Sequence, residues 1–178
     1  MQALREETLA DVNHTQEQID EIDDRINDTE NNIINTYGKI ASLRANQASD
    51  SANRFSEFID SQSAPINADL KKRQTVRSLE TDRFGYTNPQ HLFGYSGYIQ
   101  NEIKDYDTLI SFAQKKADGL RQRYRDGILK QGLSEDSEQM KALKAQLLEA
   151  DAEVVQLQQD SYNLFKEQLA QPKNYFDE

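Results

Sequence analysis

The side chains that could do chemistry in this sequence are two histidines and many carboxylates, and there is no cysteine. His14 and His91 are far apart in the chain, whereas a zinc site needs several His or Cys ligands. We therefore expect no metal site. His14 has acidic neighbours and an outward helix position, so we expect it to be solvated. His91 lies in an aromatic segment, where we expect a structural role, with ligand binding as the alternative.

The carboxylates do not form a recognisable catalytic pattern. The run Asp20, Glu21, Asp23 and Asp24 contains nothing that would hold two carboxyl groups in an apolar cleft, as acid–base catalysis requires. The segment 11–22 resembles a calcium loop only at its first positions, because it lacks Gly at the sixth place and Glu at the twelfth. Di-iron Glu-x-x-His motifs, phosphate-binding Gly loops and nucleophile motifs are absent from the sequence. The sequence predicts no enzyme and no cofactor.

The charge distribution argues against nucleic acid as a partner. The net charge is -10, with acidic first and last thirds and a slightly basic middle. Binding to phosphates needs a clear basic surplus, which this chain does not have. A basic cluster in the middle third is expected to pair with acidic side chains on neighbouring helices. It consists of Lys115, Lys116, Arg121, Arg123 and Arg125.

Residues 84–98 differ in composition from the rest of the chain, because Gly, Pro and aromatic residues are concentrated there. Gly and Pro end helices, and Asn88-Pro89 is a turn signal, so we expect a loop at one end of a helical bundle. Aromatic side chains contribute much of the binding energy at protein interfaces. The candidate partner-binding residues are Phe84, Tyr86, His91, Phe93, Tyr95 and Tyr98.

A further pattern runs across residues 80–95. It consists of Glu80-Thr81, Gly85-Tyr86, Pro89, Leu92 and Tyr95. This pattern is similar to the signature between helices in certain bacterial extracytoplasmic sensor domains. Phe84 stands where that signature has Arg, and the apolar residues that should follow Tyr86 are missing. The resemblance implies a ligand-sensing domain of a membrane receptor, with hydrophobic spans before Met1 and after Glu178 as the discriminating observation.

Long helices must position all of these residues, and the first is predicted over residues 4–47. With Val12 as position a of a heptad, apolar or β-branched residues recur at a and d, and no Gly or Pro occurs before Gly38. A repeat of this length is typical of a helix that buries one narrow seam. A buried Thr at d must donate a hydrogen bond from its hydroxyl to a carbonyl of its own helix. The a residues are Val12, Ile19, Ile26, Ile33 and Ile40, and the d residues are Thr8, Thr15, Ile22, Thr29, Thr36 and Leu43.

Two interpretations of this seam remain. We prefer a helix that packs inside its own monomeric bundle. The alternative is self-association, because β-branched residues at both a and d favour three or more strands over two.

The joint after the first helix is ambiguous. Residues 46–53 contain no large apolar residue and could turn the chain, although no Gly or Pro enforces a turn and a continuous helix is the alternative. We expect a second helix over 50–82, kinked or broken near 63–65, where Ser63 could cap a new helix and Pro65 would lie in its first turn.

The second half predicts a helical hairpin. An amphipathic stripe runs from Ile99 through Ile103, Tyr106 and Ile110 to Tyr124 and predicts a helix over 96–131. Gly132 then ends this helix with Leu133 packing back on it. Ser134 is expected to cap a final helix over 134–170.

The predicted fold is all-α: one elongated domain of residues 1–178, a mainly antiparallel four-helix bundle with coiled-coil hairpins. The predicted function is a non-enzymatic structural or protein-interaction module, with residues 84–98 as anchor and another protein or another copy as partner. The alternatives are the sensor domain and, third, a trimeric fibrous or fusion-type assembly. No run approaches the ~20 apolar residues that cross a bilayer, so membrane attachment would lie outside this chain. The compartment and any small-molecule ligand stay open.

Overall fold

The computed structural model describes residues 2–84 and 89–170, with side chains at 2–79 and 97–169. These residues form three α-helices without a strand: α1 (Gln2–Phe84), α2 (Pro89–Leu129) and α3 (Glu138–Ala170). The all-α prediction is confirmed. The chain divides into two compact units, Met1–Arg44 (unit 1) and Ala45–Glu178 (unit 2), and each is described by itself.

The expected first and second helices are one continuous helix, α1, so the prediction of four helices is wrong. Residues 46–53 continue the helix instead of turning the chain. The reason lies in the small residues of this stretch. Ala45, Ala48 and Ala52 are 4 %, 8 % and 1 % exposed and belong to the core of unit 2. Alanine is a strong helix former that also allows close helix packing, so one face of a stretch without large apolar residues is buried here.

The break expected near residues 63–65 is also absent, because α1 continues through Pro65. A proline inside a helix removes one backbone donor and costs about 3 kcal/mol or more. Packing on both sides offsets this cost. Ile59 is 1 % exposed and Leu70 is 6 % exposed, so the helix is anchored in the core before and after the proline.

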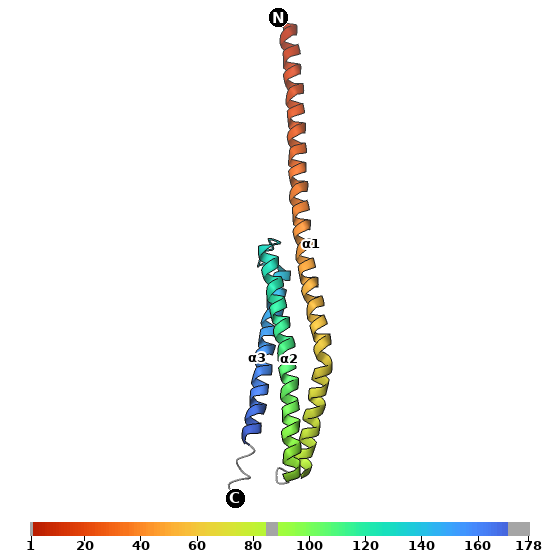
Figure 1. Cartoon of the computed structure of the whole chain (residues 1–178). Helices are drawn as coiled ribbons and strands as arrows, with labels where there is room; N and C mark the ends of the chain where they lie inside the picture. The colour runs from red at the N-terminus through yellow and green to blue at the C-terminus, as the bar shows by residue number, and fades with distance from the viewer. Residues whose placement is uncertain (1, 85–88, 171–178) are drawn as a thin grey trace. The chain divides into compact units, whose positions relative to one another are not determined.

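In unit 2, residues 45–84 of α1 run antiparallel to α2 (Figure 1). The Lys116 Nζ lies 2.7 Å from the Asp60 carboxylate, and the Arg77 Nε lies 2.7 Å from that of Glu102. From Asp60 to Arg77 the residue number on α1 rises, while that of the paired residue on α2 falls from Lys116 to Glu102. This identifies the antiparallel direction. Helix α2 is followed by α3 in an αα-hairpin, which confirms the predicted hairpin.

Helix α3 runs parallel to the same part of α1. The side-chain amide of Gln139 donates to Asn46 at 2.8 Å, and that of Gln146 donates to Asn53 at 2.7 Å. The residue numbers on α1 and α3 rise together from the first pair to the second, so these two segments run parallel. Unit 2 is therefore a three-helix bundle built from one helix segment and one hairpin.

The core of unit 2 contains two clusters of buried apolar side chains. The first consists mostly of Ala and Leu, whereas the second consists of larger side chains, Leu, Ile and Tyr. The first cluster contains Ala45, Ala48, Ala52, Ala117, Leu120, Leu133, Met140, Leu143 and Ala150. The second contains Leu70, Ile99, Tyr106, Leu109 and Leu164.

Gly119 of α2 allows a close contact with Phe55 of α1. A Cβ at position 119 would overlap the Phe55 ring. The Arg123 guanidinium carbon lies 4.0 Å from the centre of the same ring. The Phe55 ring thus lies between the backbone of Gly119 and the guanidinium of Arg123. The contact between the ring and α2 needs glycine at position 119.

Two residues of the basic cluster, Lys116 and Arg121, form ion pairs with neighbouring helices, which confirms the prediction for these two. Arg121 contacts Asp151 of α3 at 2.8 Å, and Lys116 lies between Asp60 of α1 and Glu153 of α3. These pairs are partly exposed, so each contributes about 0–1 kcal/mol.

The turn between α2 and α3 follows the predicted chemistry with one correction. Gly132 has a φ of 64° and follows the end of the helix, and Leu133 is 7 % exposed. The expected cap at Ser134 is wrong, because α3 begins at Glu138. The amide of Met140 donates to the Ser137 hydroxyl at 3.4 Å, so Ser137 occupies the N-cap position.

Candidate protein-interaction surface

The most unusual surface of the described residues is the apolar stripe of unit 1. We define the α1 seam as the a and d residues of the heptads from 12 to 43. Every residue from Gln2 to Arg44 is exposed, and the exposed fractions of the large seam residues run from 38 % at Ile40 to 68 % at Leu43. The preferred expectation, a seam buried within a monomeric bundle, is therefore wrong for this structure. The α1 seam consists of Val12, Thr15, Ile19, Ile22, Ile26, Thr29, Ile33, Thr36, Ile40 and Leu43.

The threonines at d form hydrogen bonds within their own helix that would let them be buried in an apolar environment. The Thr15 hydroxyl donates to the Asp11 carbonyl at 2.8 Å, and the Thr29 hydroxyl donates to that of Arg25 at 2.7 Å. Thr36 makes the same bond to Asn32 at 2.7 Å. A buried hydroxyl without a partner is costly. Because each hydroxyl is satisfied within its own helix, the threonine methyl groups can be covered without such a cost.

The middle of the seam carries a shallow hollow. It is lined by Ile22, Arg25, Ile26, Thr29 and Glu30. The first four occupy heptad positions d, g, a and d. In coiled coils, a knob side chain inserts into a hole formed by four residues of the facing helix. The surface at Ile26 therefore has the composition and spacing of such a hole.

Polar residues border the seam at heptad positions e and g. They carry both signs of charge, so a helix laid on the seam would meet specific electrostatic neighbours rather than a uniform field. The g residues are Asp11, Gln18, Arg25, Asn32 and Lys39, and the e residues are Gln16, Asp23, Glu30, Tyr37 and Arg44.

The apolar pattern changes register where unit 2 begins. In the register counted from Val12, the buried residues Ala45, Ala48, Ala52 and Ile59 all fall at positions b or f. Positions b and f do not belong to the a and d stripe. The α1 seam and the buried stripe of unit 2 therefore occupy different heptad positions, and only the stripe of unit 2 is buried in the structure.

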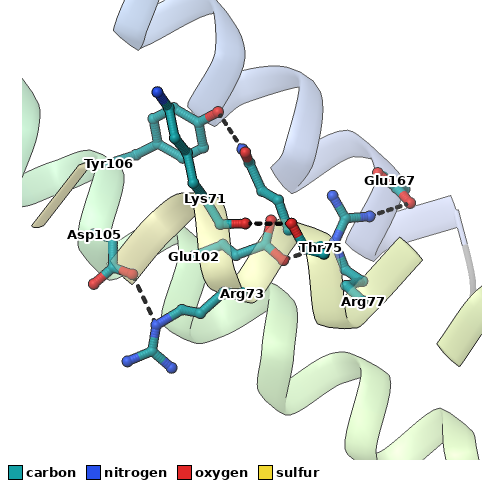
Figure 2. Close-up of polar contacts among 9 residues, drawn as sticks. Lys71, Arg73, Thr75, Arg77, Glu102, Asp105, Tyr106 and Glu167 are labelled. Carbon is teal, nitrogen blue, oxygen red and sulfur yellow. Dashed lines mark hydrogen bonds and ion pairs between the residues drawn. The ribbon is translucent and has the colours of Figure 1, made fainter. Parts of the chain in front are cut away.

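A second notable feature is a buried ion cluster in unit 2 (Figure 2). Arg77 of α1 donates from Nε to Glu102 of α2 at 2.7 Å and from Nη1 to Glu167 of α3 at 3.1 Å. Glu102 is fully buried, and its Oε2 accepts no hydrogen bond from the described residues. One arginine thus joins carboxylates of both other helices.

The environment of Glu102 shifts its titration. Burial raises the pKa of Glu102, and the negative charges of Glu167 and Asp105 act in the same direction, while the Arg77 hydrogen bond and charge oppose them. Burial also raises the pKa of Tyr106, whose hydroxyl accepts a 3.1 Å hydrogen bond from Gln74. Because Glu102 is enclosed by helices, it does not face solvent where a substrate would bind.

Sequence reasoning missed Glu102. The predicted stripe placed Ile103 and Ile110 inward, whereas Glu102 and Leu109 are buried and the two isoleucines are only half-buried. The missed signal is that Glu102 lies three residues after Ile99, on the same helix face. A charge at such a position needs a buried partner.

The aromatic residues predicted as an anchor lie mostly outside the described side chains. Residues 89–98 are helical rather than loop, because α2 begins at Pro89, and proline suits the first position of a helix. Tyr98 is half-buried on α2. The structure does not describe Tyr86, nor the side chains of Phe84, His91, Phe93 and Tyr95. Their role as a partner-binding anchor stays a prediction.

Comparison with known proteins gives no match, either among family models, among curated proteins or among solved structures. Within the described ranges, no group of three or more His, Asp or Glu side chains is placed to hold a metal ion. Across residues 2–84 and 89–170, no helix has both the length and the apolar character needed to span a bilayer.

Proposed function

We propose that this chain is a non-enzymatic structural or protein-interaction module, and that the α1 seam is where it associates with other helices in a coiled coil. The observation that carries the proposal is the exposure of a heptad stripe that extends over about four repeats. Stripes of this length are typical of helices with a helical partner. Exposed apolar patches of this kind mark interaction sites.

The contrast within α1 supports the same proposal. Between residues 45 and 70, Ala45, Ala48, Ala52, Ile59 and Leu70 are buried in unit 2, whereas residues 12–43 present an equally regular stripe to solvent. The threonine hydroxyls and the hollow at Ile26 make the seam suitable for a facing helix. The ion cluster at Glu102 lies in the core and holds the bundle together instead of binding a partner.

The test is site-specific photo-crosslinking in cells that produce the protein naturally. A photoreactive residue replaces Glu30, which borders the seam, and in a matched variant it replaces the adjacent Asn31, which points away from the seam. We expect adducts from position 30 that map to a or d residues of a helix, and far fewer from position 31. Equal yields from both positions, or no adduct from position 30, would refute seam-mediated association.

A further inference from the structure

We propose that the occupants of the α1 seam are two further copies of the same chain, in a parallel, in-register, three-stranded coiled coil. This inference rests on the proposed function, because it names the partner of that same surface. Three features of unit 1 lead to it: the side chains at a and d, the charges at e and g, and the hollow around Ile26.

The side chains at a and d indicate the number of strands. Every a residue of the seam is Val or Ile, and every d residue except Leu43 is Thr or Ile. β-Branched residues at a with Leu at d favour two strands, whereas β-branched residues at both positions shift the preference to three or four. Threonine has the branched shape, and its hydroxyl is already bonded at Thr15, Thr29 and Thr36.

The bordering charges indicate the direction of the strands. In a parallel, in-register assembly, each g residue faces the e residue five positions later in a neighbouring copy. Arg25 then faces Glu30, an opposite-charge pair, and Gln18 faces Asp23. Only Lys39 with Arg44 brings like charges together. Opposite charges at e and g are the residues that set partner choice and orientation in coiled coils.

An antiparallel arrangement is less favourable at the same place. Two antiparallel copies packed about the hollow at Ile26 are related by a two-fold axis, so each e or g residue near the axis meets its own counterpart. Arg25 would face Arg25 of the second copy, and Asp23 would face Asp23. Like charges in such positions are destabilising. The hollow itself combines Ile22, Arg25, Ile26 and Thr29, which is the hole that receives Ile26 of an in-register copy.

Sedimentation equilibrium of the purified full chain tests the number of copies. We expect the mass to rise with concentration towards three times the chain mass of 20.5 kDa. Ile26→Asp places three charges in the seam and should keep the chain monomeric. Ile34→Asp is the matched control, because Ile34 is 66 % exposed at an outward b position, and it should associate like the wild type.

Disulfide formation tests the direction, because the chain contains no cysteine of its own. Val12→Cys lies near one end of the seam, so air oxidation should link copies at this position only if the strands are parallel and in register. Asp24→Cys at an outward f position is the control and should link at least tenfold less.

Several outcomes would overturn the inference. They are a monomer at every concentration, a mass that levels at two or four chains, loss of association in Ile34→Asp, and absence of the Val12→Cys link. If the pure chain stays monomeric while the crosslinks from position 30 lead to a helix of another protein, self-association fails and the proposed function stands. If position 30 gives no adduct as well, both fail.

Discussion

Arg77 and Glu102 form a buried ion pair, with 2.7 Å between Nε and Oε1, in which the carboxylate is fully enclosed and the arginine is mostly so. Removing one partner of such a pair leaves the other charge buried alone. The two residues come from α1 and α2, and Arg77 extends the link to Glu167 of α3. The pair therefore fixes all three helices of unit 2 at one level of the bundle.

The first prediction concerns the contribution of the Arg77–Glu102 pair to the free energy of unfolding. Arg77→Met should lower the free energy of unfolding by about 3–5 kcal/mol, because Glu102 loses its cation. Arg73→Met is the matched control, since the Arg73 pair with Asp105 at 2.9 Å is more exposed, and we expect a loss of about 0–1 kcal/mol. Urea unfolding measures both. Adding Glu102→Leu to Arg77→Met should recover much of the loss, and equal losses in the two single variants would contradict the buried role.

The second prediction concerns pH. The pKa of Glu102 in the folded chain is raised above its ordinary value of 4.5, so between the two values the folded state binds more protons than the unfolded state. Stability contributed by Glu102 is therefore highest in acid and falls as pH rises through the raised pKa.

The measurement is urea unfolding of the wild type and of Glu102→Gln from pH 4.5 to neutrality. The stability of the wild type relative to the variant should decrease as pH rises and then level off. A difference that grows with pH would mean that the Arg77 pairing outweighs burial and lowers the pKa instead.

The third prediction concerns Gly119. Gly119→Ala should destabilise unit 2 by about 1–3 kcal/mol, because the new methyl group overlaps the Phe55 ring that Arg123 covers. Gly97→Ala, in the same helix with nothing within 4 Å of the added Cβ, should instead stabilise by up to about 1 kcal/mol. Thermal unfolding by circular dichroism compares them. Stabilisation by both substitutions would show that the Phe55 contact imposes no constraint.

The sequence predicted those parts of the fold in which one residue type has one structural consequence. Gly132 was predicted to end a helix, and its positive φ agrees. The threonine hydroxyls at d were predicted to bond to their own helix, and four of them do. Both are local effects that depend on few neighbours.

The sequence predictions failed where the packing of neighbouring helices decides the local structure. Residues 46–53 contain no large apolar residue and left a turn and a continuous helix open, and only the neighbouring helices, against which Ala48 and Ala52 are buried, decide between the two. Pro65 and the glycines Gly94 and Gly97 of the segment 84–98 were expected to interrupt helices, but α1 and α2 continue through them, because tertiary contacts override such propensities. The seam was recognised from its spacing, but its exposure depends on what else the chain can bury.

The fourth prediction uses the threonines of the seam. Thr29→Val keeps the branched shape and removes a hydroxyl, so each associated copy buries more apolar surface. Three copies per layer should strengthen trimer formation by roughly tenfold or more. Thr75→Val is the matched control, because Thr75 makes the same type of bond to Lys71 at 2.9 Å but lies exposed in unit 2. Sedimentation equilibrium measures both, and equal effects would contradict burial of Thr29.

The most direct test of the central claim is amide hydrogen exchange of the full chain as a function of concentration. If other copies cover the α1 seam, protection of residues 12–43 should increase with concentration, while that of residues 99–120 in the core stays constant. The increase should vanish in Ile26→Asp and persist in Ile34→Asp. Protection of residues 12–43 that is the same at every concentration and in both variants would contradict the account.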